Sequence, residues 1–227
     1  MITDEKIYHV LKDAIINGEF PPGLQLKEST LAEAFGVSRT PIRTVFQRLK
    51  YDSLIKLIPN RGAFVYCPHP NEAEQIFFMR GLLEPTAIEL AAIHATPKQI
   101  EWMEKWLKEE SRLIKQRMFL QSLVATKNLH ISIVEASGNH YLIEFLNKII
   151  TLSHIILTFY DTSEKKEENA AEEHVEIITA IKNKDSKRAK ELAQSHIISI
   201  QNDIDFSREF THSVSIHQVI SHYIEKP

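Results

Sequence analysis

Apolar side chains near the start of the chain recur with the spacing of a helix. One apolar stripe at i, i+3, i+4, i+7 and i+8 is formed by Ile7, Val10, Leu11, Ala14 and Ile15. This rhythm is typical of an amphipathic helix that buries one face. The pattern stops at Asn17-Gly18, and Pro21-Pro22-Gly23 predicts a turn soon after it.

Two further helices are predicted on either side of the short break Gly36-Val37-Ser38. The first covers residues 30–35 with Ser29 as its N-cap, and the second runs from Arg39 to about Asp52 with Ser38 as its N-cap. The second helix has an apolar stripe at residues 42, 45, 46 and 49. Its opposite side carries Arg39, Thr40, Arg43, Gln47 and Lys50. A helix, a glycine turn and a helix with a polar exposed face indicate a helix-turn-helix.

Two short apolar runs follow. Leu54–Ile58 and Ala63–Tyr66 are separated by Pro59-Asn60-Arg61-Gly62, which predicts a β-hairpin with Arg61 at its tip. Such a hairpin is placed to touch the backbone or minor groove of DNA. The first turn of the helix at Arg39 would then enter the major groove, where arginine donates two hydrogen bonds to guanine and hydroxyl groups bind phosphate.

From residue 71 onward the pattern is helical. Helices are expected at about 76–94, 97–115, 118–137, 140–161, 166–182, 185–206 and 208–223, with a charged loop at 162–168. Short turns between long helices are typical of an antiparallel bundle. The predicted fold is therefore mainly α. A winged helix-turn-helix of three helices plus a β-hairpin occupies residues 1–66, a linker 67–72, and an all-α bundle of six to seven antiparallel helices 73–227.

Charge supports the same division of the chain. The net charge is −3, but residues 37–61 carry six Lys or Arg against the single acid Asp52. This pattern excludes a globally basic nucleic-acid coat and indicates a local polyanion site, although solvated helix faces also carry such charge. The one cysteine, Cys67, excludes an internal disulfide. We expect a cytoplasmic protein without a secretion signal or a membrane helix.

The strings that form the N-terminal elements closely resemble a known family. Residues 22–26 (Pro-Gly-Leu-Gln-Leu), 31–43 (Leu-Ala-Glu-Ala-Phe-Gly-Val-Ser-Arg-Thr-Pro-Ile-Arg) and 60–65 (Asn-Arg-Gly-Ala-Phe-Val) resemble the winged helix-turn-helix of GntR-family transcription regulators. The resemblance implies that Arg39 and Arg43 read bases and that Ser38 and Thr40 bind phosphate. It also implies a wing tip at Arg61-Gly62. The expected DNA contacts are Ser29, Ser38, Arg39, Thr40, Arg43, Gln47, Lys50, Arg61 and Gly62.

Two positions depart from the usual pattern of that family. Ser53 replaces the glycine that usually precedes the wing, and Thr44-Val45 replaces the common Glu-Ala. We therefore expect a different operator preference with DNA binding retained.

Three of the eleven histidines lie in the middle of separate predicted helices, namely His130, His174 and His196. All three can point into one bundle interior, where facing imidazoles at ~2.0–2.1 Å bind a first-row metal. A lone interior histidine is more often a hydrogen-bonded part of the core. The spacing alone leaves both interpretations open.

The C-terminal part also resembles a family domain. The strings at 80–87 (Arg-Gly-Leu-Leu-Glu-Pro-Thr-Ala), 129–130, 135–139 and 173–174, with the later His196, resemble the FCD domain of FadR-type GntR regulators. Many such domains bind a divalent metal through three His and one Asp, which lies one helical turn before the first His. Thr126 occupies that position here. The resemblance thus implies a zinc or nickel site at His130, His174 and His196, weakened by the loss of the anionic ligand.

The expected effector contacts are Arg80, Thr126 and His154. Arg80 can clamp a carboxylate through two hydrogen bonds, or it can pair with Glu84 at i+4. His154 lies mid-helix between apolar neighbours, which makes it a pocket candidate. Water or a carboxylate of the effector would take the fourth metal position.

The leading hypothesis is a ligand-responsive transcription regulator, not an enzyme. It would bind a palindrome in double-stranded DNA as a homodimer under the control of a small carboxylate metabolite. One alternative is a three-histidine zinc-dependent hydrolase, although Thr126 and Val134 offer it no carboxylate base. Another is an architectural DNA-binding protein with a purely structural helical body, which predicts no ligand-induced shift in melting temperature.

Overall fold

The computed structural model describes residues 2–160, 164–202, 204–206 and 214–225. The chain forms two compact units. The N-terminal unit consists of residues 1–68 and 208–227, and the helical unit consists of residues 69–207.

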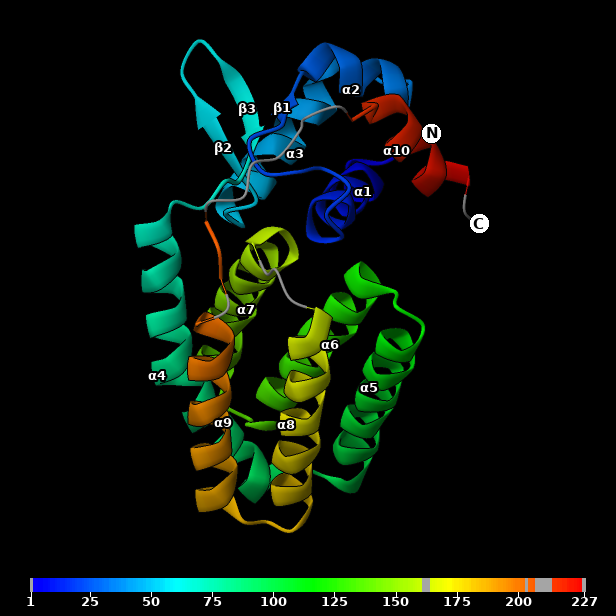
Figure 1. Ribbon diagram of the computed structural model, residues 1–227. Coiled ribbons are helices and arrows are strands. Elements are labelled where there is room, and N and C mark those ends of the chain that lie inside the picture. Colours follow the sequence, from blue (N-terminus) through cyan, green and yellow to red (C-terminus); the bar gives the residue numbers. More distant parts are fainter. Residues whose placement is uncertain (1, 161–163, 203, 207–213, 226–227) are drawn as a thin grey trace. The chain divides into compact units, whose positions relative to one another are not determined.

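The front of the chain folds into three helices and a small sheet (Figure 1). The elements are α1 (Asp4–Ile16), β1 (Gln25–Leu26), α2 (Glu28–Phe35), α3 (Arg39–Tyr51), β2 (Ile55–Ile58) and β3 (Gly62–Val65). The antiparallel sheet has the order β1-β3-β2, and Ile58 pairs with Gly62 across the hairpin. The predicted winged helix-turn-helix is therefore confirmed. Strand β1 is an additional strand, too short at two residues to produce an alternating pattern.

The apolar stripes of the three helices form the core of this unit. Ile7, Leu11, Leu31, Ile42 and Leu49 are all fully buried. Burying each of these side chains stabilises the unit by about 1.5–3 kcal/mol relative to leaving it exposed. This core fixes α3 with its polar side turned outward.

The two predicted N-caps have different outcomes. Lys27 is the N-cap of α2, so Ser29 lies inside the first turn of α2, and its prediction as a cap is wrong. The extended backbone that follows β1 ends at Lys27, which places the helix start two residues earlier than the apolar pattern indicates. Ser38 is the N-cap of α3, but its hydroxyl makes no capping hydrogen bond.

The last helix, α10 (Ile216–Glu225), belongs to the N-terminal unit. It packs against α1 and α2, where Ile220 is fully buried and Asn17 Nδ2 donates a 2.9 Å hydrogen bond to the Tyr223 hydroxyl. This arrangement differs from the expected assignment of residues 73–227 to one helical domain. An amphipathic stripe predicts a buried face but not the surface that buries it.

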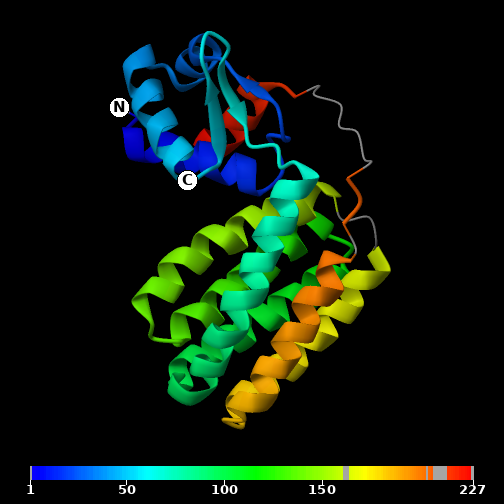
Figure 2. The ribbon, with the colours of Figure 1, turned by 90° about the vertical axis from the view of Figure 1, so that its left-hand side faces the viewer.

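The helical unit contains six helices among its described residues. They are α4 (Pro70–His94), α5 (Pro97–Lys115), α6 (Phe119–Ala136), α7 (His140–Tyr160), α8 (Glu164–Lys182) and α9 (Ser186–Gln201). Helices α4 and α9 pack side by side, as Figure 2 shows. The charged loop expected at 162–168 is helical from Glu164 onward, whereas 162 and 163 lie outside the described residues. Residues 208–213 of the last expected helix also lie outside them.

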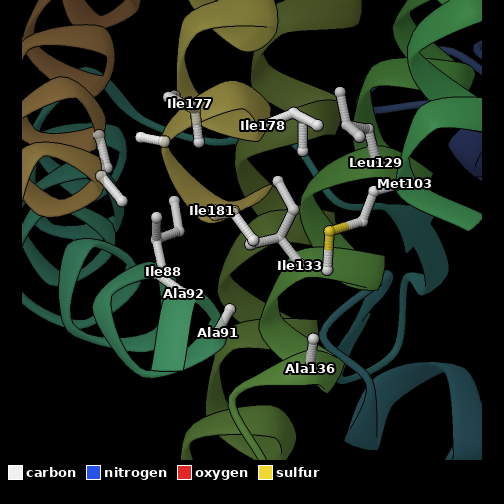
Figure 3. Close-up of a cluster of buried hydrophobic side chains, with 13 residues drawn as sticks. Ile88, Ala91, Ala92, Met103, Leu129, Ile133, Ala136, Ile177, Ile178 and Ile181 are labelled. Carbon is white, nitrogen blue, oxygen red and sulfur yellow. The ribbon is translucent and has the colours of Figure 1, made fainter. Parts of the chain in front are cut away.

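One cluster of apolar side chains joins the helices of this unit (Figure 3). Ile88 of α4, Met103 of α5, Ile133 of α6 and Ile181 of α8 meet there, and none is more than 1% exposed. The cluster holds these helices in fixed register. It thereby positions the polar groups that the same helices carry.

Helix α7 is long and apolar enough to cross a membrane by length and composition alone, which the apolar pattern did not lead us to expect. Its most apolar window is 56% buried within the structure. A core helix of a bundle has the same composition, so the observation is weak evidence for a membrane span.

Candidate functional site

The turn between α2 and α3 exposes the N-terminal end of α3. Gly36 ends α2 in the left-handed conformation, with φ of 64°, which glycine adopts without steric cost. Arg39, Thr40, Arg43, Gln47 and Lys50 are all exposed on α3, whereas Ile42, Val45, Phe46 and Leu49 are buried on its other side. The predicted polar face is therefore present and open to solvent.

One acidic side chain orients this face and was missed in the sequence. Arg43 Nε donates a 2.9 Å hydrogen bond to Glu28 Oε2 on α2, and the Arg43 side chain is 65% exposed. A carboxylate at Nε leaves the terminal nitrogens as the donors for another partner. No periodicity signals this pair, because the two residues lie on different helices.

The wing tip is also exposed. Asn60 and Gly62 both have positive φ, of 60° and 94°, which lets the chain reverse within three residues. Gln25 Nε2 donates a 2.8 Å hydrogen bond to the Arg61 carbonyl and so ties β1 to the tip. The guanidinium of Arg61 lies over the Phe64 ring at 5.5 Å, which leaves its donors available to a phosphate.

The three predicted histidines converge in the helical unit. His130 of α6, His174 of α8 and His196 of α9 are each no more than 2% exposed. His174 Nε2 lies 3.1 Å from His130 Nε2 and 3.1 Å from His196 Nε2. Three ring nitrogens this close, drawn from three helices, form a group that could hold one metal ion.

Each of these imidazoles is held by a carboxylate at its other nitrogen. Glu84 Oε1 lies 2.5 Å from His130 Nδ1, Glu110 Oε2 lies 3.0 Å from His174 Nδ1, and Glu173 Oε2 lies 2.7 Å from His196 Nδ1. An ionised carboxylate only accepts hydrogen bonds, so each Nδ1 carries the proton and each Nε2 presents its lone pair. Metal-binding histidines are oriented in this way, and the donor set therefore fits a divalent metal.

The protonation states agree with that assignment. Burial lowers the pKa of His130, although Glu84 opposes the shift, and burial lowers the pKa of His196 well below its ordinary value. Burial alone would raise the pKa of Glu84, but the charge of Arg80 and the hydrogen bonds outweigh it and hold that pKa far below its usual range. Burial likewise opposes ionisation of Glu110, yet His174 and Thr126 keep the pKa of Glu110 lowered. Neutral imidazoles at His130 and His196, beside the ionised Glu84 and Glu110, are suited to binding a cation.

Arg80 makes one of the two contacts considered for it, the pair with Glu84, and it also contacts α7. Its Nε donates a 2.5 Å hydrogen bond to Glu84 Oε2, and its Nη1 donates to Ser153 Oγ at 3.2 Å. The intra-helix pair with Glu84 is thus present. Among the described residues, Nη2 is buried with no hydrogen-bond partner, and Arg80 lines a cavity of about 60 Å³ together with the three histidines. A buried guanidinium nitrogen without a partner is a position where an acceptor from a ligand would be stabilised.

Thr126 and His154 line the same cavity, as does Glu110. Thr126 Oγ1 contacts Glu110 Oε1 and lies 3.0 Å from the Ser122 carbonyl. His154 is 4% exposed. The structure thus brings all the predicted metal and effector residues around one cavity, and it adds Glu110, which no spacing in the sequence connected to them.

Comparison with known proteins finds a family match for each of the two units. Residues 3–65 match the model of the bacterial regulatory proteins of the gntR family, and residues 75–199 match the FCD domain. The chain is 29% identical over 195 residues to the uncharacterized HTH-type transcriptional regulator YdhC of Bacillus subtilis, covering 86% of this chain and 85% of that one. It is 25% identical to the HTH-type transcriptional repressor GlaR of Escherichia coli, covering 87% and 94%.

Solved structures share the fold. A putative transcriptional regulator GntR from Rhodococcus sp. RHA1 aligns with a TM-score of 0.79 at 20% identity, over 88% of this chain and 95% of that one. Escherichia coli McbR/YncC aligns with a TM-score of 0.75 at 20% identity, over 89% and 99%. Both family matches end before α10, at residues 65 and 199.

Proposed function

The chain belongs to the gntR family of bacterial regulatory proteins and carries an FCD domain, and from this premise we propose that a divalent metal and a small organic acid bound in the helical unit control its affinity for DNA. The family assignment makes the chain a DNA-binding transcription regulator. It gives no support to the three-histidine hydrolase.

The exposed face of α3 is the proposed DNA reader. Arg39 and Arg43 would donate to base edges in the major groove, while Ser38 and Thr40 would bind phosphate. Ser38 supports this role because its hydroxyl is not engaged in capping α3. Ser29, Gln47, Lys50, Arg61 and Gly62 would add contacts to the DNA backbone, and all are exposed.

His130, His174 and His196 would hold the metal, with Zn²⁺ or Ni²⁺ as the proposed ions. These ions suit three neutral imidazole nitrogens and, when bound, would supply positive charge to an acidic ligand. Arg80 would bind the carboxylate of the acid through Nη2, and His154 would close the cavity beside it. The observation that carries this proposal is the convergence of three Nε2 atoms at a cavity that Arg80 also lines, with Nη2 of Arg80 unpartnered among the described residues.

A homodimer is proposed because one recognition helix reads only half of a palindrome. Large apolar side chains on α4 and α7 are exposed, and these two helices pack against each other. Phe78 and Leu82 of α4 are 64% and 54% exposed, and Tyr141 and Phe145 of α7 are 69% and 59% exposed. An exposed apolar surface of this kind suits a protein interface, so we place the dimer contact on α4 and α7.

The test is a DNA-binding titration with the full chain on fragments that flank its own gene. Metal-stripped protein, metal-loaded protein and metal-loaded protein with a panel of organic acids are compared. A ligand controls DNA binding only if it binds the free protein and the DNA-bound protein with different affinities. We therefore expect the dissociation constant for DNA to differ between the three kinds of preparation. An unchanged dissociation constant in all of them would favour the architectural alternative, in which the helical unit is purely structural.

A further inference from the structure

Thr126 occupies the position at which the resemblance implies an aspartate. Its hydrogen bonds determine whether its hydroxyl can donate to a ligand or only accept from one. It lies on α6 one turn before His130 and lines the cavity. Its Oγ1 contacts two atoms that only accept hydrogen bonds, namely Glu110 Oε1 and the Ser122 carbonyl oxygen. Both contacts therefore draw on the one proton that a threonine hydroxyl carries.

The hydroxyl consequently has no proton left for a ligand in the cavity. The Ser122 carbonyl oxygen, 3.0 Å away, can only accept, so the hydroxyl proton is engaged whatever Glu110 does. Thr126 Oγ1 thus offers the cavity lone pairs only. Arg80 lines the same cavity, and its Nη2, which has no partner among the described residues, can only donate.

We propose that Thr126, held by Glu110, makes this site selective for an organic acid that carries a hydroxyl group. The carboxylate of the acid accepts a hydrogen bond from Arg80 Nη2, and the hydroxyl donates one to Thr126 Oγ1. A cavity of about 60 Å³ suits an acid of a few heavy atoms, such as a short 2-hydroxycarboxylate. This inference rests on the proposed metal centre and names the ligand class that it takes.

An aspartate at position 126 would act differently. Its negatively charged carboxylate would bind the metal itself, as the resemblance implies. Threonine removes that charge, and a buried acceptor that stays unpaired is unfavourable. A site built to pair with a hydroxyl therefore discriminates against the analogue that lacks it.

A purely structural role for Thr126 makes a different prediction. If the hydroxyl only positioned Glu110, and through it His174, its loss would weaken metal binding and would weaken all acids equally. The ratio of affinities for two acids that differ by one hydroxyl separates the two roles. Chelation of the metal by a hydroxy acid also raises this ratio, so the change caused by the substitution is the decisive quantity.

The experiment uses the full chain loaded with Ni²⁺, with metal content measured by elemental analysis and binding of glycolate and acetate measured by calorimetry. Thr126→Val is compared with Thr151→Val, which removes a half-buried threonine hydroxyl that donates to the Asn147 carbonyl at 2.7 Å and does not line the cavity. We expect the preference for glycolate over acetate to fall about tenfold in Thr126→Val and to remain in Thr151→Val and Thr126→Ser.

An unchanged preference in Thr126→Val overturns the inference, as does equal binding of the two acids, or binding of neither, by wild-type protein. In each of these cases a full metal content would leave the proposed metal centre intact. Wild-type protein that takes up no Ni²⁺ would contradict both the metal centre and the inference.

Discussion

The face of α3 and the histidine centre of the helical unit are built in opposite ways. The five polar residues of the α3 face come from one continuous helix and lie open to solvent. The histidine centre takes its imidazoles from α6, α8 and α9 and their carboxylate partners from α4, α5 and α8, almost all of them buried. A surface that meets a large charged partner must remain hydrated, whereas a site that holds a small ion needs its ligands fixed in advance. In the proposed function, this difference lets the N-terminal unit read DNA while the helical unit binds a small ligand.

The largest effect is expected on the α3 face. Arg39→Ala combined with Arg43→Ala removes two proposed base contacts, each worth about 1–3 kcal/mol. The affinity for the preferred DNA should therefore fall by about 10²-fold or more, measured by fluorescence anisotropy. Metal uptake should not change, because no histidine is touched. The control Arg188→Ala removes an exposed arginine of α9, and parental affinity in the double variant would show that another surface reads the DNA.

A second substitution tests whether destabilising the N-terminal unit leaves metal binding by the helical unit unchanged. Ile220 of α10 is fully buried in the N-terminal unit, so Ile220→Ala should cost about 2–5 kcal/mol of the free energy of unfolding of that unit. The matched control Ile198→Ala, at a residue 62% exposed, should change it by less than about 0.5 kcal/mol. Urea unfolding measures the stability of the N-terminal unit, and a metal titration measures the metal affinity of the helical unit. A large loss of metal affinity in Ile220→Ala would contradict independence.

The sequence predicts the α3 face well because every residue on it obeys one local periodicity. It places three histidines in the middle of separate helices, but their spacing alone leaves open whether they meet, and only the resemblance to the FCD domain implies a shared site. It does not reveal Glu110, because nothing in α5 distinguishes that carboxylate from Glu109 or Glu104 until α5 packs against α6 and α8. The position of α10 is hidden for the same reason. Long-range pairing depends on tertiary packing, which a pattern along the chain does not specify.

A smaller effect is expected from the carboxylate behind His196. Glu173→Gln keeps the shape but removes the charge that holds Nδ1 at 2.7 Å, and loss of such a partner typically lowers metal affinity 10- to 100-fold. We expect about a tenfold loss, measured by competition with a chelator, because the Glu173 side chain is 37% exposed. The neighbouring Glu172→Gln serves as the control. Equal affinities in the two variants would show that Glu173 does not support the site.

The smallest effect concerns pH. Burial raises the pKa of the Tyr223 hydroxyl to about 12, whereas in an unfolded chain tyrosine loses its proton near pH ~10. Its contribution to stability is therefore present below pH ~10 and is lost as the pH rises toward 12. Tyr223→Phe should reduce the loss of stability at alkaline pH. At neutral pH it should lower the free energy of unfolding by about 1 kcal/mol, because the hydrogen bond from Asn17 is lost. Tyr51→Phe, at a residue 80% exposed, should do neither, and the same alkaline slope in both variants would disprove the assignment.

The proposed function depends most directly on metal uptake by the helical unit. The measurement is elemental analysis of the full chain after loading with Zn²⁺ or Ni²⁺ and removal of the excess, beside a variant with His130, His174 and His196 replaced by alanine. We expect about one ion per chain in the wild type, as three converging imidazoles bind a single ion, and none in the variant. Wild-type protein that holds no metal after loading would contradict the proposed metal centre. A variant that retains as much metal as the wild type would contradict it too.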